Sequence, residues 1–582
     1  MKKRIWIRII AGALSLLFLA GCAVRPKTSV SPSPEPVPAA TPAPTLVPAP
    51  SEGPVAEAFA WEGRELGYDG VHGDVDYADM AWYLYDMTEF DARADDLSAA
   101  SDPAEAEALY RWLLDEYSRL NTLDELAWIR FYADGSEENS QACQDTDEML
   151  TRAGDTLHAA IASALNGSAG QAFSEGVGED VAESLSDYEE MTDREIQLLD
   201  RETELELAYN DLIVREDLSG PEMNFQAGEI FLELVAIRNE LADIYGYDSF
   251  ADYAYEAYYG RDYTPADAEA LCREIRPYAR RYYQNCCYCD AFYVDLGSAG
   301  RKTPEELIEL LREYAPRISA ESAEAERYME DHGLYLLAGD IADLGFTTTL
   351  SYYNAPFLYN SLTGSIYDIQ SCFHEFGHYC DAYINIPDNL LTSVGSYDIF
   401  EIHSTGLEAL SYGWYGEIFG DKAEEARIWC LDGLMYNVIT GCMFDEFQQY
   451  VYSHPDLTVE EVNNCWLRIM KDYGQEPWTQ SNAYQWMFVS HNFESPFYYI
   501  SYAASALASV QIWSRSQVDR DATIELYNRL VGMGAYDYGY CELLGNLGLH
   551  VFTDGVDGCL KDFYGDFEEM CLRYDRYGRA AA

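Results

Sequence analysis

The sequence predicts a mainly α-helical fold. Acidic and apolar residues alternate at helical spacing over residues 104–117, 194–214 and 228–245, as in helices that bury one face. Proline, which interrupts helices, is sparse after residue 56. With 582 residues, 48% of them apolar, the chain is long enough to bury a large core.

The first 57 residues do not follow this helical pattern. Residues 1–22 join a basic start to a short apolar run and end in Leu-Ala-Gly-Cys, as a bacterial lipoprotein signal does. We expect Cys22 to be lipidated and to hold the chain on the outer side of a bacterial membrane. A lone membrane-spanning helix is the alternative, but the apolar run is short for that. Residues 23–57 contain nearly half of the 21 prolines, which predicts an unfolded tether.

The charge and the cysteines limit the possible partners. A formal net charge of −64 excludes nucleic acid, because its phosphates would be repelled. We expect the chain to contact a membrane only through its lipid anchor. The 14 cysteines include Cys22, and the other 13 are scattered. Residues 286–289 lack the second Cys-x-x-Cys unit that a zinc site of paired units needs. We therefore interpret them as structural thiols.

One stretch predicts β-structure. Residues 347–353 are β-branched and aromatic, residues 354–355 can turn, and residues 356–359 can form a returning strand. Pro356 has no N–H, so it belongs at an edge or at the start of a strand. Such a hairpin can pair with an extended peptide or can be purely structural.

The segment from His374 to His378 reads His-Glu-Phe-Gly-His. A capping-box-like start at Ser365 predicts a helix here, and Pro387 ends it. Ile369, Phe373, Phe376 and Cys380 would form its buried stripe. His374 and His378 are four residues apart, so both imidazoles project from one face, as two ligands of a tetrahedral zinc must. Glu375, beside them, is the candidate general base.

A third ligand is expected on a second helical segment, which begins at residues 395–396. Glu401 and Glu408 are seven residues apart and share a face, so one can bind zinc while the other supports the ligands. We expect Glu401 to be the ligand, and Glu408 and Asp398 to be the supporting residues. His403 is two positions from Glu401 and points elsewhere, which predicts a structural role.

These residues resemble the thimet oligopeptidase and oligopeptidase F family of zinc peptidases. The form HEFGH is typical of that family, as is the acidic-apolar-apolar-Glu run of residues 398–401. Residues 402–405 depart from the Pro-Ser-Gln-like run that usually follows, and only Ser404 matches. The resemblance extends to residues 234–255 and to 491–502, and it covers about residues 190–570.

The resemblance implies further site residues and a fold. His491, Tyr499 and Tyr502 match the residues with which the family stabilises the tetrahedral intermediate and grips the substrate backbone. The family fold is a large, mainly α-helical zincin-type body with a deep substrate channel and a small β-hairpin near the active site. Residues 58–330 would form a helical channel wall, and residues 331–582 the catalytic region.

The resemblance therefore implies a monomeric endopeptidase with one zinc ion per chain. It would hydrolyse short, unstructured oligopeptides with a zinc-activated water, and Glu375 would act as general base. Two alternatives remain: a non-catalytic peptide-binding lipoprotein, and a zinc carboxypeptidase-like exopeptidase.

Overall fold

The computed structural model describes residues 70–185, 191–215, 217–338, 345–387, 389–391, 395–477 and 479–581. The predicted signal peptide and tether lie outside these residues. Contacts divide the chain into two compact units. We call the described residues of 9–189 and 300–393 the His374 unit, and those of 190–299 and 394–582 the Glu401 unit. The predicted division at residue 330 stays a prediction.

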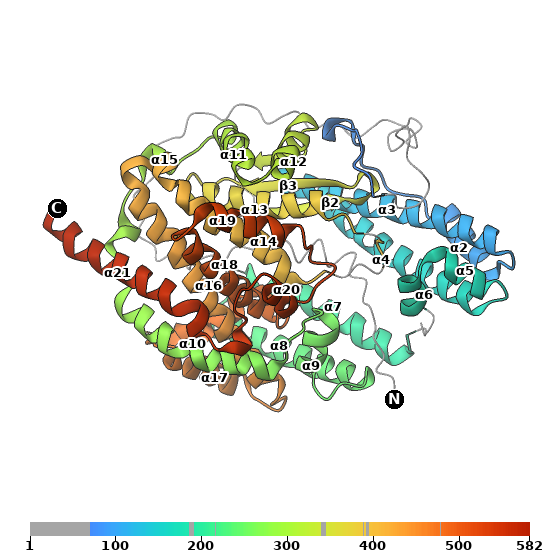
Figure 1. The fold of residues 1–582 in the computed structure, drawn as a ribbon. Coiled ribbons are helices and arrows are strands. Elements are labelled where there is room, and N and C mark those ends of the chain that lie inside the picture. The colour runs from blue at the N-terminus through green and yellow to red at the C-terminus, as the bar shows by residue number, and fades with distance from the viewer. Residues whose placement is uncertain are drawn as a thin grey trace. The chain divides into compact units, whose positions relative to one another are not determined.

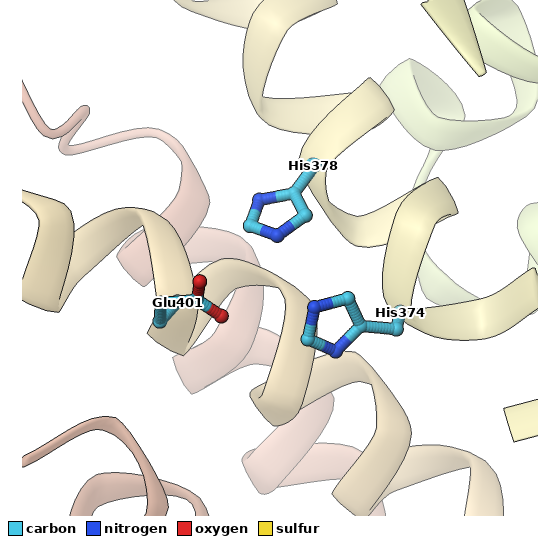
Figure 2. Close-up of side chains that lie close together, drawn as sticks. All are labelled: His374, His378 and Glu401. Carbon is cyan, nitrogen blue, oxygen red and sulfur yellow. The ribbon is translucent and has the colours of Figure 1, made fainter. Parts of the chain in front are cut away.

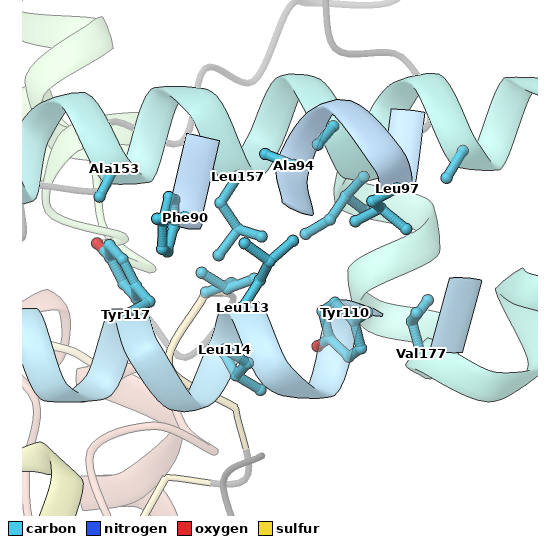
Figure 3. Packing of buried hydrophobic residues seen from close by; sticks show 14 of the residues in the cluster. Phe90, Ala94, Leu97, Tyr110, Leu113, Leu114, Tyr117, Ala153, Leu157 and Val177 are labelled. Atoms are coloured by element: carbon cyan, nitrogen blue, oxygen red, sulfur yellow. The ribbon is translucent and has the colours of Figure 1, made fainter. Parts of the chain in front are cut away.

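The His374 unit is mainly helical. Its elements are η3 (Tyr77–Asp79), α2 (Thr88–Ala99), α3 (Pro103–Asp134), α4 (Glu137–Asn166), α5 (Gly170–Val177), α6 (Glu179–Leu185), α11 (Pro304–Ile318), α12 (Ala320–Asp331), β1 (Tyr335–Ala338), β2 (Gly345–Leu350), η7 (Ser351–Tyr353), β3 (Ala355–Ser361) and α13 (Ile366–Ile384). A core of Leu, Ala, Phe and Tyr side chains joins α2 to α5, and Phe90, Leu113 and Leu157 are fully buried in it (Figure 3).

The small sheet has the strand order β1-β3-β2. Strand β2 pairs antiparallel with β3, which confirms the predicted hairpin, although the first strand ends at Leu350 and a 3-10 turn follows. The chain reverses direction at Asn354, whose backbone is in the left-handed conformation. Pro356 lies at the start of β3, before β1 joins that strand at Leu358. Strand β1 pairs parallel with β3, and the sequence analysis did not predict it.

Helix α13 packs on this sheet, against both β2 and β3 (Figure 1). Its first turn has the predicted capping box, in which Ser365 and Asp368 satisfy each other's backbone N–H groups. The predicted stripe of Ile369, Phe373, Phe376 and Cys380 is buried. The helix ends at Ile384, before Pro387.

The Glu401 unit consists of helices and short helical turns in its described residues. The helices are α7 (Asp193–Ile213), α8 (Gly220–Ile244), α9 (Phe250–Tyr253), α10 (Pro265–Asn285), α14 (Tyr397–Ser411), α15 (Tyr415–Phe419), α16 (Ala423–Tyr452), α17 (Val459–Asp472), α18 (Tyr499–Ser516), α19 (Arg520–Val531), α20 (Tyr540–Asn546) and α21 (Asp557–Ala581). The turns are the π-helical η4 (Ala254–Tyr258), η5 (Asp290–Tyr293), η6 (Gly297–Ala299), η8 (Tyr412–Trp414), η9 (Gly420–Lys422), η10 (Gln480–Phe488), η11 (Ser490–Asn492) and η12 (Phe552–Asp554).

Helix α18 forms the centre of the Glu401 unit, since α14, α16, α19 and α21 all pack against it. Gly441 of α16 allows a close approach, because a Cβ there would lie 2.6 Å from the Tyr499 carbonyl oxygen. Within the described residues, no helix combines the length and apolarity needed to cross a bilayer. The predicted class, mainly helical with a small sheet, is confirmed.

Candidate metal centre

Helix α13 presents two imidazoles side by side. The rings of His374 and His378, one turn apart, have centroids 4.9 Å from each other. Each residue is only 6% exposed. The buried stripe on the other side of the helix packs into the unit and fixes this orientation.

Glu401 of α14 completes a group of three. Ligand atoms of His374, His378 and Glu401 all lie within 4.8 Å of one another. Figure 2 shows the two rings and the carboxylate directed toward one another. Two imidazole nitrogens and a carboxylate oxygen are a donor set that fits a divalent metal and leaves a fourth position open. Because a carboxylate that is 4% exposed is poorly solvated, a bound cation would also stabilise its charge.

Glu375 lies against strand β2. The hydroxyl of Thr347 donates to the Glu375 carbonyl oxygen at 2.8 Å and lies 3.3 Å from its Oε2. On the same strand, a Cβ at Gly345 would come within 2.8 Å of Glu375 Oε1. Gly345 therefore leaves room for the Glu375 carboxylate, and the Thr347 hydroxyl binds the Glu375 backbone. Neither residue was predicted from the sequence to belong to the site.

Tyr498 holds the Glu401 carboxylate. Its hydroxyl donates to Glu401 Oε1 at 3.0 Å, and the Thr405 hydroxyl donates to the Glu401 carbonyl oxygen at 2.5 Å. The residues predicted from the sequence were its neighbours Tyr499 and Tyr502, and Tyr498 was not among them. The spacing could have identified Tyr498 as a site residue, because residues 498 and 502 are four apart and share a helical face.

His491, Tyr499 and Tyr502 lie together around Tyr498. The His491 ring is 5.1 Å from the rings of Tyr498 and Tyr499 and 6.1 Å from that of Tyr502, measured between centroids. Burial lowers the pKa of His491 to about 4, so the imidazole is neutral near pH 7. Its buried Nε2 has no hydrogen-bond partner among the described residues. Tyr498 connects this cluster to Glu401, because its hydroxyl donates to the Glu401 carboxylate.

The predicted supporting residues have partners within the Glu401 unit. Asp398 accepts a hydrogen bond from the Tyr263 hydroxyl at 2.7 Å and lies 3.5 Å from Arg261 Nε. Glu408 accepts one from the Tyr412 hydroxyl at 3.1 Å. His403 is fully buried.

The cysteines of the described residues form no disulfide, and most are buried. Burial raises the pKa of several of these thiols, Cys372 and Cys380 of α13 among them, to about 12. Such thiols stay protonated and unreactive near pH 7, which agrees with a structural role. Cys22 lies outside the described residues.

The depressed pKa of His491 predicts a pH-dependent stability. The unfolded imidazole binds a proton below pH 6.5, whereas the folded one does so only near pH 4. Its contribution, about 3 kcal/mol, is therefore present above pH 6.5 and is lost as the pH falls to 4. We expect the thermal midpoint of His491→Gln to fall less than that of the wild type between pH 7 and 4.5. A constant difference between the two midpoints across this range would contradict the burial argument.

Comparison with protein-family models and with curated proteins finds no match. Solved structures do match. A protein designated an oligoendopeptidase F is 23% identical, with a TM-score of 0.69, over 85% of this chain and 98% of that one. PZ peptidase A is 21% identical, with a TM-score of 0.68, over 85% and 98%. A protein designated an oligoendopeptidase F from Bacillus anthracis is 20% identical, with a TM-score of 0.68, over 87% and 99%. The chain therefore has the fold of these structures.

Proposed function

We propose that the chain is a monomeric, zinc-dependent endopeptidase that hydrolyses short, unstructured oligopeptides. The observation that carries the proposal is the buried group of His374, His378 and Glu401, with Glu375 next to the first histidine on the same helix. The fold shared with structures designated oligoendopeptidases supports the same substrate class.

His374, His378 and Glu401 would hold the zinc ion. This ligand set, two imidazoles and one carboxylate, is the one that zinc peptidases use, and it leaves a position for water. A bound zinc ion supplies a water whose pKa is lowered to about 7 and polarises the scissile carbonyl. The hydrogen bond from Tyr498 orients the Glu401 carboxylate, and each carboxylate oxygen can accept more than one partner, so the group can still bind a metal.

Glu375 would act as the general base. It takes a proton from the attacking water and later delivers it to the leaving amine, so no covalent intermediate forms. Its carboxylate is held in the space that Gly345 leaves, which limits the positions it can take. Such restriction suits a group that must meet one particular proton.

The aromatic cluster would stabilise the developing oxyanion. The Tyr498 hydroxyl is engaged with Glu401, which leaves Tyr499, Tyr502 and the neutral His491 as candidate donors. Burial raises the pKa of Tyr499 well above its usual range, so its hydroxyl stays protonated and able to donate.

The two alternatives differ from this proposal in testable ways. A non-catalytic peptide-binding lipoprotein would not need a general base. The presence of Glu375 therefore argues against that alternative. A carboxypeptidase-like exopeptidase would remove only terminal residues. Mass spectrometry of the products from a mixed peptide library distinguishes internal cleavage, terminal trimming and no cleavage.

Glu375→Gln tests the proposal. The variant keeps the shape of the side chain but cannot accept the proton, so we expect cleavage of an internally quenched peptide to fall by about 10³-fold or more. Zinc content, measured by atomic emission, should stay at the wild-type level because Glu375 is not a ligand. Wild-type protein that is loaded with zinc yet cleaves no peptide in the library would refute the enzyme assignment.

Gly345→Ala is the companion variant. Its added methyl group meets side-chain oxygens of Glu375 and Ser371, which can move, so the fold should be retained while the carboxylate is displaced. We expect a loss of about 10-fold in kcat/KM, well short of that in Glu375→Gln. Thr349→Ala, on the same strand, serves as the control.

We also propose that lipid on Cys22 anchors the chain to the outer side of a bacterial membrane. The support is the sequence of residues 1–22 and the proline-rich stretch that follows. Cys22→Ser should shift the protein from the detergent-extracted membrane fraction to the aqueous fraction. A variant that stays with the membrane as fully as the wild type would contradict the anchor.

A further inference from the structure

Arg261 is a buried arginine to which the sequence analysis gave no role. Its side chain is 0% exposed. The guanidinium carbon lies 4.6 Å, 4.4 Å and 5.7 Å from the ring centroids of Tyr255, Tyr259 and Tyr263. These tyrosines occur at every fourth residue, and the first of them lies in the π-helical turn η4. The cation is thus enclosed by three aromatic rings, which stabilise it in place of water.

Arg261 joins the two chain segments that meet at Glu401. Its Nη2 donates to the Phe497 carbonyl oxygen and to the Ser501 hydroxyl, both at 2.9 Å. Its Nε lies 3.5 Å from Asp398 Oδ2. Asp398 is three residues before Glu401 on α14, and Phe497 directly precedes Tyr498. One guanidinium therefore connects the helix of the carboxylate with the segment of the hydroxyl that binds it.

Two of the surrounding tyrosines reinforce this connection. The Tyr263 hydroxyl donates to Asp398 Oδ2 at 2.7 Å, and the Tyr259 hydroxyl donates to the Pro496 carbonyl oxygen at 3.0 Å. Each side of the connection thus also receives one hydrogen bond from a tyrosine that encloses Arg261.

The backbone at Phe497 needs such support. Its φ is 67°, in the left-handed region that a bulky residue rarely adopts. The Phe497 N–H donates to Gln448 Oε1 at 2.6 Å, while Arg261 binds the carbonyl oxygen. A conformation of this kind persists only where its surroundings hold it, and here both peptide groups are held. The turn sends the chain into α18 with Tyr498 facing Glu401.

We propose that Arg261 is a positioning residue for the metal centre. It fixes the turn at Phe497 relative to Asp398, so that the Tyr498 hydroxyl meets the Glu401 carboxylate. Its effect on catalysis rests on the proposed function, whereas its effect on metal binding does not. Lysine cannot replace it, because a single ammonium lacks the planar fork that spans Asp398, Phe497 and Ser501.

The test is Arg261→Lys, which keeps the charge within the tyrosine rings. We expect zinc affinity, measured by competition with a chelator, to fall by about 10- to 100-fold. The visible absorption of the cobalt-substituted protein should shift, because it reports ligand geometry. For peptide cleavage, kcat should fall by about 10-fold or more with KM within about threefold, since the change acts on the site and not on substrate contacts.

Arg238→Lys is the matched control. Arg238 is equally buried, donates to Glu202 Oε1 at 2.7 Å, and also donates to a backbone carbonyl oxygen, that of Phe493. We expect a comparable loss of thermal stability, with zinc affinity within about threefold of the wild type. Equal losses of zinc affinity in the two variants would overturn the positioning role and leave a general structural one.

Tyr263→Phe is a milder second variant, which tests the same inference if Arg261→Lys does not fold. It removes only the hydroxyl that binds Asp398, and we expect zinc affinity to fall by about threefold to tenfold. Its control is Tyr282→Phe, which removes a buried hydroxyl that donates to Asp432 at 2.8 Å in the same unit. Unchanged affinity and an unchanged cobalt spectrum in Tyr263→Phe would overturn the inference. Weakened zinc binding in a protein that cleaves no peptide would sustain it while refuting the proposed function.

Discussion

Glu401 carries a carboxylate into a buried position beside two imidazoles, and the organisation of the site follows from that placement. A charge removed from water is unfavourable unless hydrogen bonds or an opposite charge compensate it. Tyr498 supplies a hydrogen bond to one oxygen, and a divalent cation shared with His374 and His378 would supply the opposite charge. The same arrangement favours the binding of a divalent metal and makes that binding depend on the exact position of Glu401.

The chain that carries His491 and Tyr498 is neither a long helix nor a strand, so its backbone groups need partners from elsewhere. Buried side chains provide them: next to Tyr498, Tyr259 binds the Pro496 carbonyl oxygen and Arg261 that of Phe497. Arg238 binds the Phe493 carbonyl oxygen, five residues before Tyr498. Gln448 binds both the Phe497 N–H and the Asn492 side chain. The many buried polar groups of the Glu401 unit thus hold an irregular segment in one conformation.

Local patterns allowed much of the fold to be predicted from the sequence. Helix α13, with its cap at Ser365 and its buried stripe, and the β2–β3 hairpin depend on neighbours in sequence. The pair His374 and His378 follows from one helical spacing. Strand β1 was missed because its parallel pairing with β3 is set by packing and has no short-range signal. Thr347, Gly345 and Arg261 were missed because they meet their partners across many residues of chain, where periodicity carries no information.

The most direct test of the metal centre is X-ray absorption at the zinc edge of the purified protein. The account predicts about one zinc ion per chain, with nitrogen and oxygen ligands at about 2.0 Å and no sulfur ligand. It also predicts that His378→Ala removes this signal. A spectrum dominated by sulfur at about 2.3 Å would place the metal among the cysteines, and one unchanged by His378→Ala would place it away from this site. Either result would contradict the proposed metal centre.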